Sequence, residues 1–184
     1  RKFMVAYDED KAIDYLGTPL APYWHKSIGS AAQLVFESQS YYESIIANCA
    51  KFDDALMSDL TKAGDEKYAQ LCALAYRQAF AGCGLALSPD GKPWMFAKEN
   101  SSNGCISTVD VIYPAAPVFL LLSPALMEAN LAPVMDYADS PRWKFNFAPH
   151  DLGTYPRADG HVYGGGEKTD ANQMPVEESA NMLI

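Results

Sequence analysis

A long repeat of apolar residues at helical spacing constrains the fold more than any other feature of the sequence. From Ser30 onward these residues recur every three or four positions, with one gap at Ser38. They are Leu34, Tyr41, Ile45, Cys49, Phe52, Leu56 and Leu60. This period places them on one face of an amphipathic helix, which normally buries that face in a core. The chain is therefore expected to be mainly helical.

A second helical pattern follows after a very short connection. Gly64 is suited to end the first helix and Asp65 to cap the next, which is predicted to run to about Leu87. Two long helices joined by so short a link form an antiparallel αα-hairpin.

The rest of the chain predicts further helices separated by polar connections. Asn103-Gly104 indicates the turn of a β-hairpin, and Ser123-Pro124 and Pro175 are suited to begin helices. The predicted segments of this single domain or part-domain are an extended lead-in at 1–28, a first αα-hairpin at 30–87, a β-hairpin at 92–107, a second αα-hairpin at 109–139, a polar loop at 141–173 and the start of a further helix at 174–184.

Charge and hydropathy exclude several classes of partner. The chain has 14 Lys and Arg against 23 Asp and Glu, a formal net charge of -9, and no basic cluster, which argues against nucleic acid. The longest apolar run, residues 115–122, is far too short to span a membrane. Glu167, Asp170 and Asn172 offer oxygen ligands, but their spacing fits no EF-hand. No metal and no cofactor is predicted, and the expected partner is a small molecule.

Carboxylates are the main candidates for chemistry, because the sequence contains no HExxH, GxSxG, P-loop or dinucleotide fingerprint. Asp110 lies at the start of a predicted helix, and Glu177 and Glu178 lie in the first turn of another. Acids at these positions commonly complement the helix dipole. The alternative is that they act as general acid or base at the mouth of a pocket.

The segment "FAPHDLGTYP" (147–156) has no helical or strand period, yet it is rich in functional side chains. His150 and Asp151 are adjacent, so their side chains are expected to diverge and not to form a dyad. They either stabilise the loop by hydrogen bonds or face a substrate. The same loop region carries His161, which is expected to be structural.

Three blocks, "TVDVIYP", "FAPHDLGTYP" and "MPVEE", resemble the glutaminase A family, and the resemblance extends over nearly the whole chain. It implies a secreted or periplasmic protein that hydrolyses L-glutamine to glutamate and ammonia. It also implies a longer protein, with a β-sandwich region followed by an α/α toroid of the six-hairpin glycosidase kind. This chain would supply the early hairpins of that toroid, and residues 168–173 look like an insertion relative to the family pattern.

Enzymes on six-hairpin toroids commonly use paired carboxylates. The resemblance therefore implies four catalytic candidates, which are Asp110, Asp151, Glu177 and Glu178. Free glutamine also needs a cation for its α-carboxylate, most naturally an arginine. The predicted substrate-binding residues are His150, Arg142, Arg157, Tyr155 and Asn103.

Two alternatives to a glutaminase remain open from the sequence. One is a carbohydrate-active hydrolase on the same toroid, with two carboxylates beside an aromatic platform such as Trp94. The other is a non-catalytic helical domain. A part of a toroid would be inactive by itself and would expose apolar helix faces, so self-association is expected.

Overall fold

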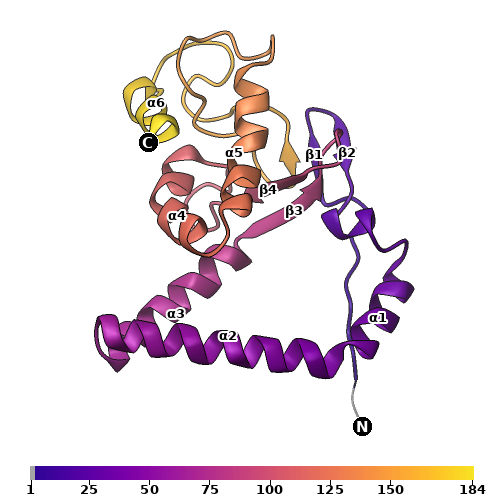
Figure 1. Cartoon of the computed structure of the whole chain (residues 1–184). Coiled ribbons are helices and arrows are strands. Elements are labelled where there is room, and N and C mark those ends of the chain that lie inside the picture. The colour runs from indigo at the N-terminus through magenta and orange to yellow at the C-terminus, as the bar shows by residue number, and fades with distance from the viewer. Residues whose placement is uncertain (1–2) are drawn as a thin grey trace. The chain divides into compact units, whose positions relative to one another are not determined.

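The computed structural model describes residues 3–184, which form two compact units (Figure 1). The first unit comprises residues 3–8 and Ser27–Ala81, and the second comprises Glu9–Lys26 and Gly82–Ile184. The fold is mainly helical, as predicted, and it also contains two small sheets. No helix among the described residues is long and apolar enough to cross a membrane.

The first unit consists of the helices α1 (Ala31–Ser40), α2 (Tyr42–Ala63) and α3 (Glu66–Ala81). Ser30 caps α1 by accepting a hydrogen bond from the Gln33 amide, and Asp65 caps α3 by accepting one from the Tyr68 amide. The long helix predicted from Ser30 is divided into α1 and α2 at Tyr41, which departs from helical geometry.

The apolar stripe of the first unit does not form a core within the described chain. Ala69 is the one buried residue among the described residues of this unit. Ile45 and Phe52 on α2, and Leu71 and Leu74 on α3, are exposed. The expectation that the whole stripe faces a core is therefore wrong for the described chain, in which Leu34, Leu56 and Leu60 of the stripe are half-buried.

The second unit contains an antiparallel pair of strands, β3 (Cys83–Leu87) and β4 (Pro93–Ala97). Two predictions are corrected here. The helix expected to continue to Leu87 ends at Ala81, since the small and apolar residues after it pair with β4 as a strand. The β-hairpin expected at 92–107 is formed only in part. β4 pairs mainly with the preceding strand, while the chain returns after the turn through an antiparallel bridge between Lys98 and Ile106 and a hydrogen bond from the Ser107 amide to the Ala97 carbonyl.

A second sheet joins the lead-in of the chain to its polar loop. Its order is β2 (Thr18–Leu20), β1 (Ile13–Tyr15) and β5 (Arg157–Ala158), with β1 and β5 parallel. A short 3-10 helix, η1 (Tyr23–Lys26), follows β2 and contacts β3.

Three helices complete the second unit: α4 (Val109–Leu122), α5 (Pro124–Ala138) and α6 (Pro175–Leu183). Helix α4 contacts both α5 and α6, and α5 also packs on β4. The core between them is aromatic: the Tyr15 hydroxyl donates to Asp136 on α5, and its ring meets the ring of Trp94 edge-on.

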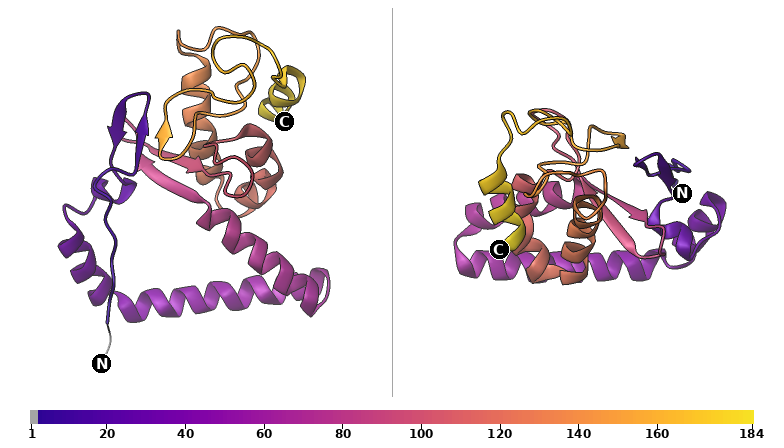
Figure 2. Two further views of the ribbon diagram at one scale, coloured as in Figure 1. Left: turned by 180° about the vertical axis from the view of Figure 1, so that it is seen from behind. Right: turned by 90° about the horizontal axis from the view of Figure 1, so that it is seen from above.

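The segment between α5 and α6 has little regular secondary structure, yet it is held in place because many of its residues are buried. Figure 2 shows that it passes through β5 before it reaches α6. Trp143, Leu152 and Ala158 are buried in it, and so are His150, Asp151 and His161. Its backbone hydrogen bonds reach the turn before α4, where the Val109 amide donates to the His150 carbonyl. The segment is thus an internal part of the unit, which fixes the side chains it carries.

Gly153 is required in this segment for two reasons, and its substitution provides a test. Its φ is +128°, and an added Cβ would lie 2.6 Å from the Arg157 carbonyl oxygen. Gly153→Ala should lower the unfolding free energy by about 1–3 kcal/mol from backbone strain, with the clash adding to it. The measurement is chemical denaturation followed by circular dichroism.

Gly84→Ala is the matched control for that measurement. Gly84 lies in β3, has no positive φ, and has open space where a Cβ would be placed. Its replacement should leave the unfolding free energy unchanged or slightly raised. Equal destabilisation by both variants would contradict the role assigned to Gly153.

Candidate functional site

Asp151 is the centre of the candidate site. Its side chain is fully buried, and its Oδ1 accepts hydrogen bonds from the amides of Gly153 at 2.8 Å and Val162 at 3.0 Å. Its Oδ2 accepts one from the Tyr163 amide at 3.1 Å and lies 3.0 Å from His150 Nδ1. Because both oxygens are saturated by neighbouring donors, the carboxylate is fixed in position.

His150 and Asp151 form a dyad, contrary to the prediction that their side chains diverge. The chain bends at His150, so the two consecutive side chains converge instead of alternating as they would in a strand. With Nδ1 engaged by the carboxylate, that nitrogen carries the proton and Nε2 is the acceptor. The ring is further held by stacking on Tyr163, with centroids 4.2 Å apart and planes at 20°.

Two carboxylates approach the imidazole from helix N-termini. Asp110 lies in the first turn of α4 and Glu178 in the first turn of α6. Asp110 Oδ1 is 3.9 Å from His150 Nε2, and one ligand atom from each of the three side chains lies within 4.8 Å of the others. We call Asp110, His150 and Glu178 the acidic cluster.

The acidic cluster has buried oxygen atoms without hydrogen-bond partners. Glu178 is 1% exposed, and neither of its carboxyl oxygens has a partner, although the Asn181 amide is near. Asp110 Oδ1 is likewise buried and unpaired. Burial and the nearby Asp110 charge raise the pKa of Glu178 to about 7, and His150 opposes this rise.

The charges of the same carboxylates also shift the pKa of His150. Burial lowers the pKa of its imidazole, but the hydrogen bond and charge of Asp151 and the charges of Glu178 and Asp110 outweigh burial. The pKa of His150 is therefore raised above its ordinary value. The cluster is a set of interacting titratable groups, which is the pattern that functional sites commonly show.

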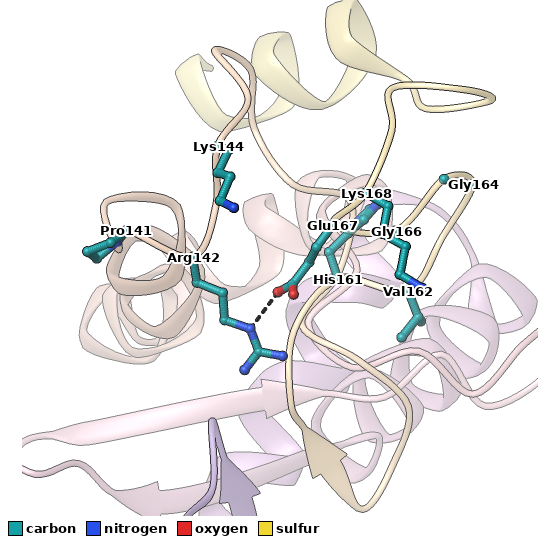
Figure 3. A pocket seen from close by; sticks show the side chains of 10 residues that line it. Pro141, Arg142, Lys144, His161, Val162, Gly164, Gly166, Glu167 and Lys168 are labelled. Atoms are coloured by element: carbon teal, nitrogen blue, oxygen red, sulfur yellow. Dashed lines mark ion pairs between the residues drawn. The ribbon is translucent and has the colours of Figure 1, made fainter.

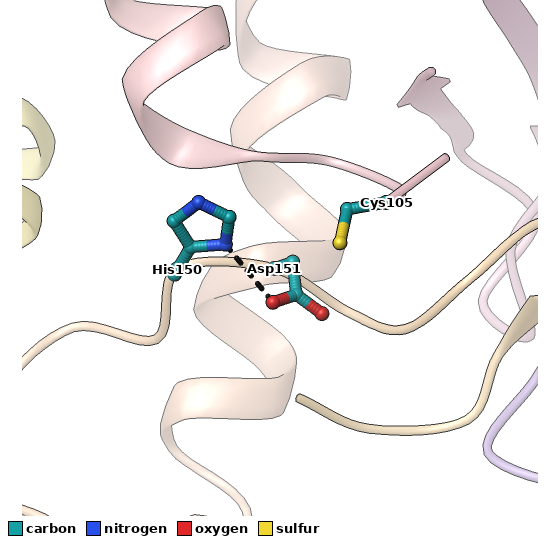
Figure 4. Close-up of side chains that lie close together, drawn as sticks. All are labelled: Cys105, His150 and Asp151. Carbon is teal, nitrogen blue, oxygen red and sulfur yellow. Dashed lines mark hydrogen bonds and ion pairs between the residues drawn. The ribbon is translucent and has the colours of Figure 1, made fainter. Parts of the chain in front are cut away.

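Cys105 lies beside the dyad (Figure 4) but is not a nucleophile. Its sulfur is within 4.8 Å of ligand atoms of His150 and Asp151, and the residue is buried. Burial, with the charges of Asp151, Glu99 and Asp110, raises the pKa of this thiol to about 12. The reactive thiolate is thus disfavoured here.

A cavity of about 820 Å³ is lined by His161, which contacts Asp151, and by residues of the same segment (Figure 3). Arg142 lines it and forms an ion pair with Glu167, with Nε and Oε1 2.7 Å apart, and another with Asp159. Lys144 and Lys168 also line it, and no carboxylate of the described residues lies within ion-pair distance of either. The cavity therefore combines several cations with one carboxylate.

Hydrogen bonds connect this cavity to the dyad. The Tyr137 hydroxyl donates to Glu167 at 2.6 Å and accepts from the His161 amide at 3.1 Å. The His161 ring, buried against Trp143, places Nδ1 3.3 Å from Asp151 Oδ2, while its Nε2 has no partner.

Sequence reasoning missed Tyr137 and Glu167 as parts of the site and treated His161 as structural. Only the position of His161 before the Gly164–Gly166 run was a signal.

The predicted site residues divide into two groups. The structure brings together Asp110, Asp151, Glu178 and His150. Among the rest, Glu177 is exposed because its neighbour Glu178 occupies the buried face of α6.

The remaining binding candidates have other contacts. Asn103 accepts a hydrogen bond from the Cys105 amide in a turn, and Tyr155 lies under the Lys98 ammonium at 4.2 Å. Arg157 is exposed in β5. No hydrogen bond or ion pair joins these residues to His150 among the described residues, and Arg142 reaches the dyad only through the network above.

Replacing Asp151 tests whether this carboxylate holds the loop. Asp151→Asn places an amide nitrogen against backbone donors, so the unfolding free energy should fall by about 2–4 kcal/mol. Urea denaturation at neutral pH measures it. Asp159→Asn, which removes an exposed ion pair to Arg142, should cost at most about 1 kcal/mol. A loss for Asp151→Asn no larger than the control's would contradict the assignment.

Comparisons with known proteins identify the family. A model described as the glutaminase A six helical-hairpin domain matches residues 65–184, and a model for a domain of unknown function matches residues 1–59. The chain is 37% identical over 188 residues to a protein named Glutaminase A from Aspergillus oryzae, covering 99% of this chain and 26% of that protein.

A second relative, a protein named as a probable glutaminase from Arthroderma benhamiae, is 31% identical over 191 residues, covering 99% of this chain and 21% of the relative. The chain thus spans about a quarter of the length of the curated relatives it matches. No solved structure matches it. The resemblance inferred from the sequence blocks is confirmed: the chain belongs to the glutaminase A family.

Proposed function

We propose that this chain carries part of the active site of an amidohydrolase that converts L-glutamine and water to L-glutamate and ammonia. One observation carries the proposal: the acidic cluster presents unpaired buried carboxyl oxygens next to an imidazole that Asp151 orients. The names of the two relatives support glutamine as the substrate.

The acidic cluster suits activation of water. Attack on an amide carbonyl requires a water that loses a proton and a leaving nitrogen that gains one. His150 Nε2 and the carboxyl groups of Asp110 and Glu178 are proton acceptors that lie within 4.8 Å of one another, so a water bound between them has acceptors for its proton. Asp151 is a positioning residue in this scheme, because it fixes the tautomer and orientation of His150.

The cavity beside Arg142 suits the charged end of an amino acid. A free α-carboxylate needs a cation, and Arg142, Lys144 and Lys168 line the cavity. An α-ammonium needs an acceptor, which Glu167 offers. These residues are proposed for substrate recognition, whereas Arg157, Tyr155 and Asn103 have surface or turn roles.

The wider family expectations remain predictions for this chain. We propose that the α4–α5 pair and α6 contribute early hairpins to an α/α toroid, as the matched six helical-hairpin model suggests. Export from the cytoplasm also remains a prediction from the resemblance.

A glycoside hydrolase is the second candidate, favoured by one observation. Carboxyl oxygens of Asp110 and Glu178 lie within 4.8 Å, close to the separation of about 5–5.5 Å in retaining glycosidases. The predicted aromatic platform does not accompany them, because Trp94 is buried against Tyr15 and Phe96.

Ammonia release from glutamine tests the proposal in a protein that carries this chain within the full length of its relatives. Asp110→Asn, His150→Gln and Glu178→Gln should each lower turnover by about 100-fold or more, as expected for loss of acid–base groups. Glu177→Gln, which changes the neighbouring exposed carboxylate, should leave turnover unchanged.

The same assay separates the two candidates. Release of ammonia without cleavage of aryl glycosides supports the amidohydrolase. Cleavage of glycosides without release of ammonia from glutamine would refute it in favour of the second candidate. Turnover that survives all three cluster substitutions within tenfold would remove the cluster from the mechanism.

A further inference from the structure

We propose that Asp110, His150 and Glu178 bind one divalent transition-metal ion of the Zn²⁺ class. This site deepens the proposed function and rests on it: with the ion bound, the three side chains would act as its ligands instead of as free proton acceptors, and the ion would supply the activation of water. The donor set is one imidazole nitrogen and two carboxylates, contributed by α4, the 139–174 segment and α6. Three protein ligands and an open fourth position are the usual composition of a catalytic zinc site, and imidazole and carboxylate are both among its ligand types.

The orientation of His150 is the first independent support. A histidine that binds a metal through one nitrogen usually donates a hydrogen bond from the other to a carboxylate, which fixes the ring and raises its basicity. Asp151 accepts from Nδ1 at 3.0 Å and is itself held by three backbone amides. Nε2 is left as the lone-pair donor directed to Asp110.

The unpaired oxygens are the second support. A buried carboxyl oxygen normally has a hydrogen-bond partner, because leaving it without one is costly. Glu178 is 1% exposed with both oxygens unpaired, and Asp110 Oδ1 is also buried and unpaired. A cation between them would satisfy these atoms and balance two carboxylates that otherwise repel each other.

The spacing of the donors requires a modest contraction. Ligand atoms about 2.0–2.2 Å from a tetrahedral zinc lie roughly 3.3–3.6 Å apart. Asp110 Oδ1 and His150 Nε2 are 3.9 Å apart, and all three donor atoms lie within 4.8 Å. Small side-chain rotations of Asp110 and Glu178 close this difference.

The imidazole selects the class of metal. Mg²⁺ and Ca²⁺ prefer all-oxygen coordination, whereas an imidazole nitrogen suits Zn²⁺ and other first-row transition metals such as Ni²⁺ and Cu²⁺. The buried thiol of Cys105 is not part of this donor set, since it groups with His150 and Asp151 and not with Asp110 and Glu178.

Direct binding tests the site without reference to activity. The 184-residue chain is stripped with a chelator, dialysed against Zn²⁺ or Co²⁺ and analysed for bound metal by mass spectrometry, with circular dichroism confirming the fold. We expect one ion per chain, d–d absorption bands for Co²⁺, and at least tenfold weaker binding of Mg²⁺ and Ca²⁺ by calorimetry.

Neighbouring glutamates provide a matched pair of variants. Glu178→Gln and Asp110→Asn should each weaken Zn²⁺ binding by at least tenfold, while Glu177→Gln should bind as the unmodified chain does. Asp151→Asn should weaken binding about 10–100-fold through the orientation of His150. Because Asp151→Asn also affects stability, the results for Glu178→Gln and Asp110→Asn decide whether the acidic cluster binds the ion.

Two results would overturn the metal site. One is a folded chain that retains no stoichiometric ion. The other is equal loss of binding in Glu177→Gln and Glu178→Gln, which would indicate surface binding. The test of the metal site can be told apart from the test of the proposed reaction. A bound ion without ammonia release would refute only the glutaminase function, and release by metal-free, chelator-treated enzyme would refute only a catalytic role for the ion.

Discussion

The buried carboxylate of Asp151 is the interaction on which the site depends. Three backbone amides from its own segment donate to it, and both histidines of the site contact it. A loop without regular structure has few backbone hydrogen bonds of its own, so a central acceptor replaces the ladder that a strand or helix would supply. The segment can therefore be irregular and still hold side chains at fixed distances.

The same carboxylate contacts one histidine of each of two chemically different regions. One is the acidic cluster, where burial and like charge dominate. The other is the cavity beside Arg142, where cations dominate. Tyr137 and His161 connect them through hydrogen bonds and the contact of His161 with Asp151.

Sequence reasoning predicted the helices well where periodicity and capping agreed, as at Ser30 and Asp65. It failed after Ala81, because a short run of small and apolar residues is compatible with a helix or a strand until its partner β4 is known. The acids of the site were recognisable as helix N-terminal residues, and the choice of Glu178 over Glu177 needed only the burial of α6. The dyad of His150 and Asp151 was not predictable, since a bend at one residue reverses the expected divergence, and Tyr137 and Glu167 join the site only through contacts distant in sequence.

The parallel pairing of β1 with β5 has a consequence for biosynthesis. Tyr15 and Ala158 are register partners, so a strand made near the start of the chain finds its neighbour only after well over a hundred further residues have been translated. Contacts of such high sequence separation form late, since the entropy of closing the intervening loop must be overcome first. During synthesis β1 has only β2 as a partner, and the segment that carries His150 and Asp151 lacks its sheet. This segment is therefore expected to be among the last parts of the unit to acquire its final shape, and β1 presents an open strand edge to chaperones or to other nascent chains until then.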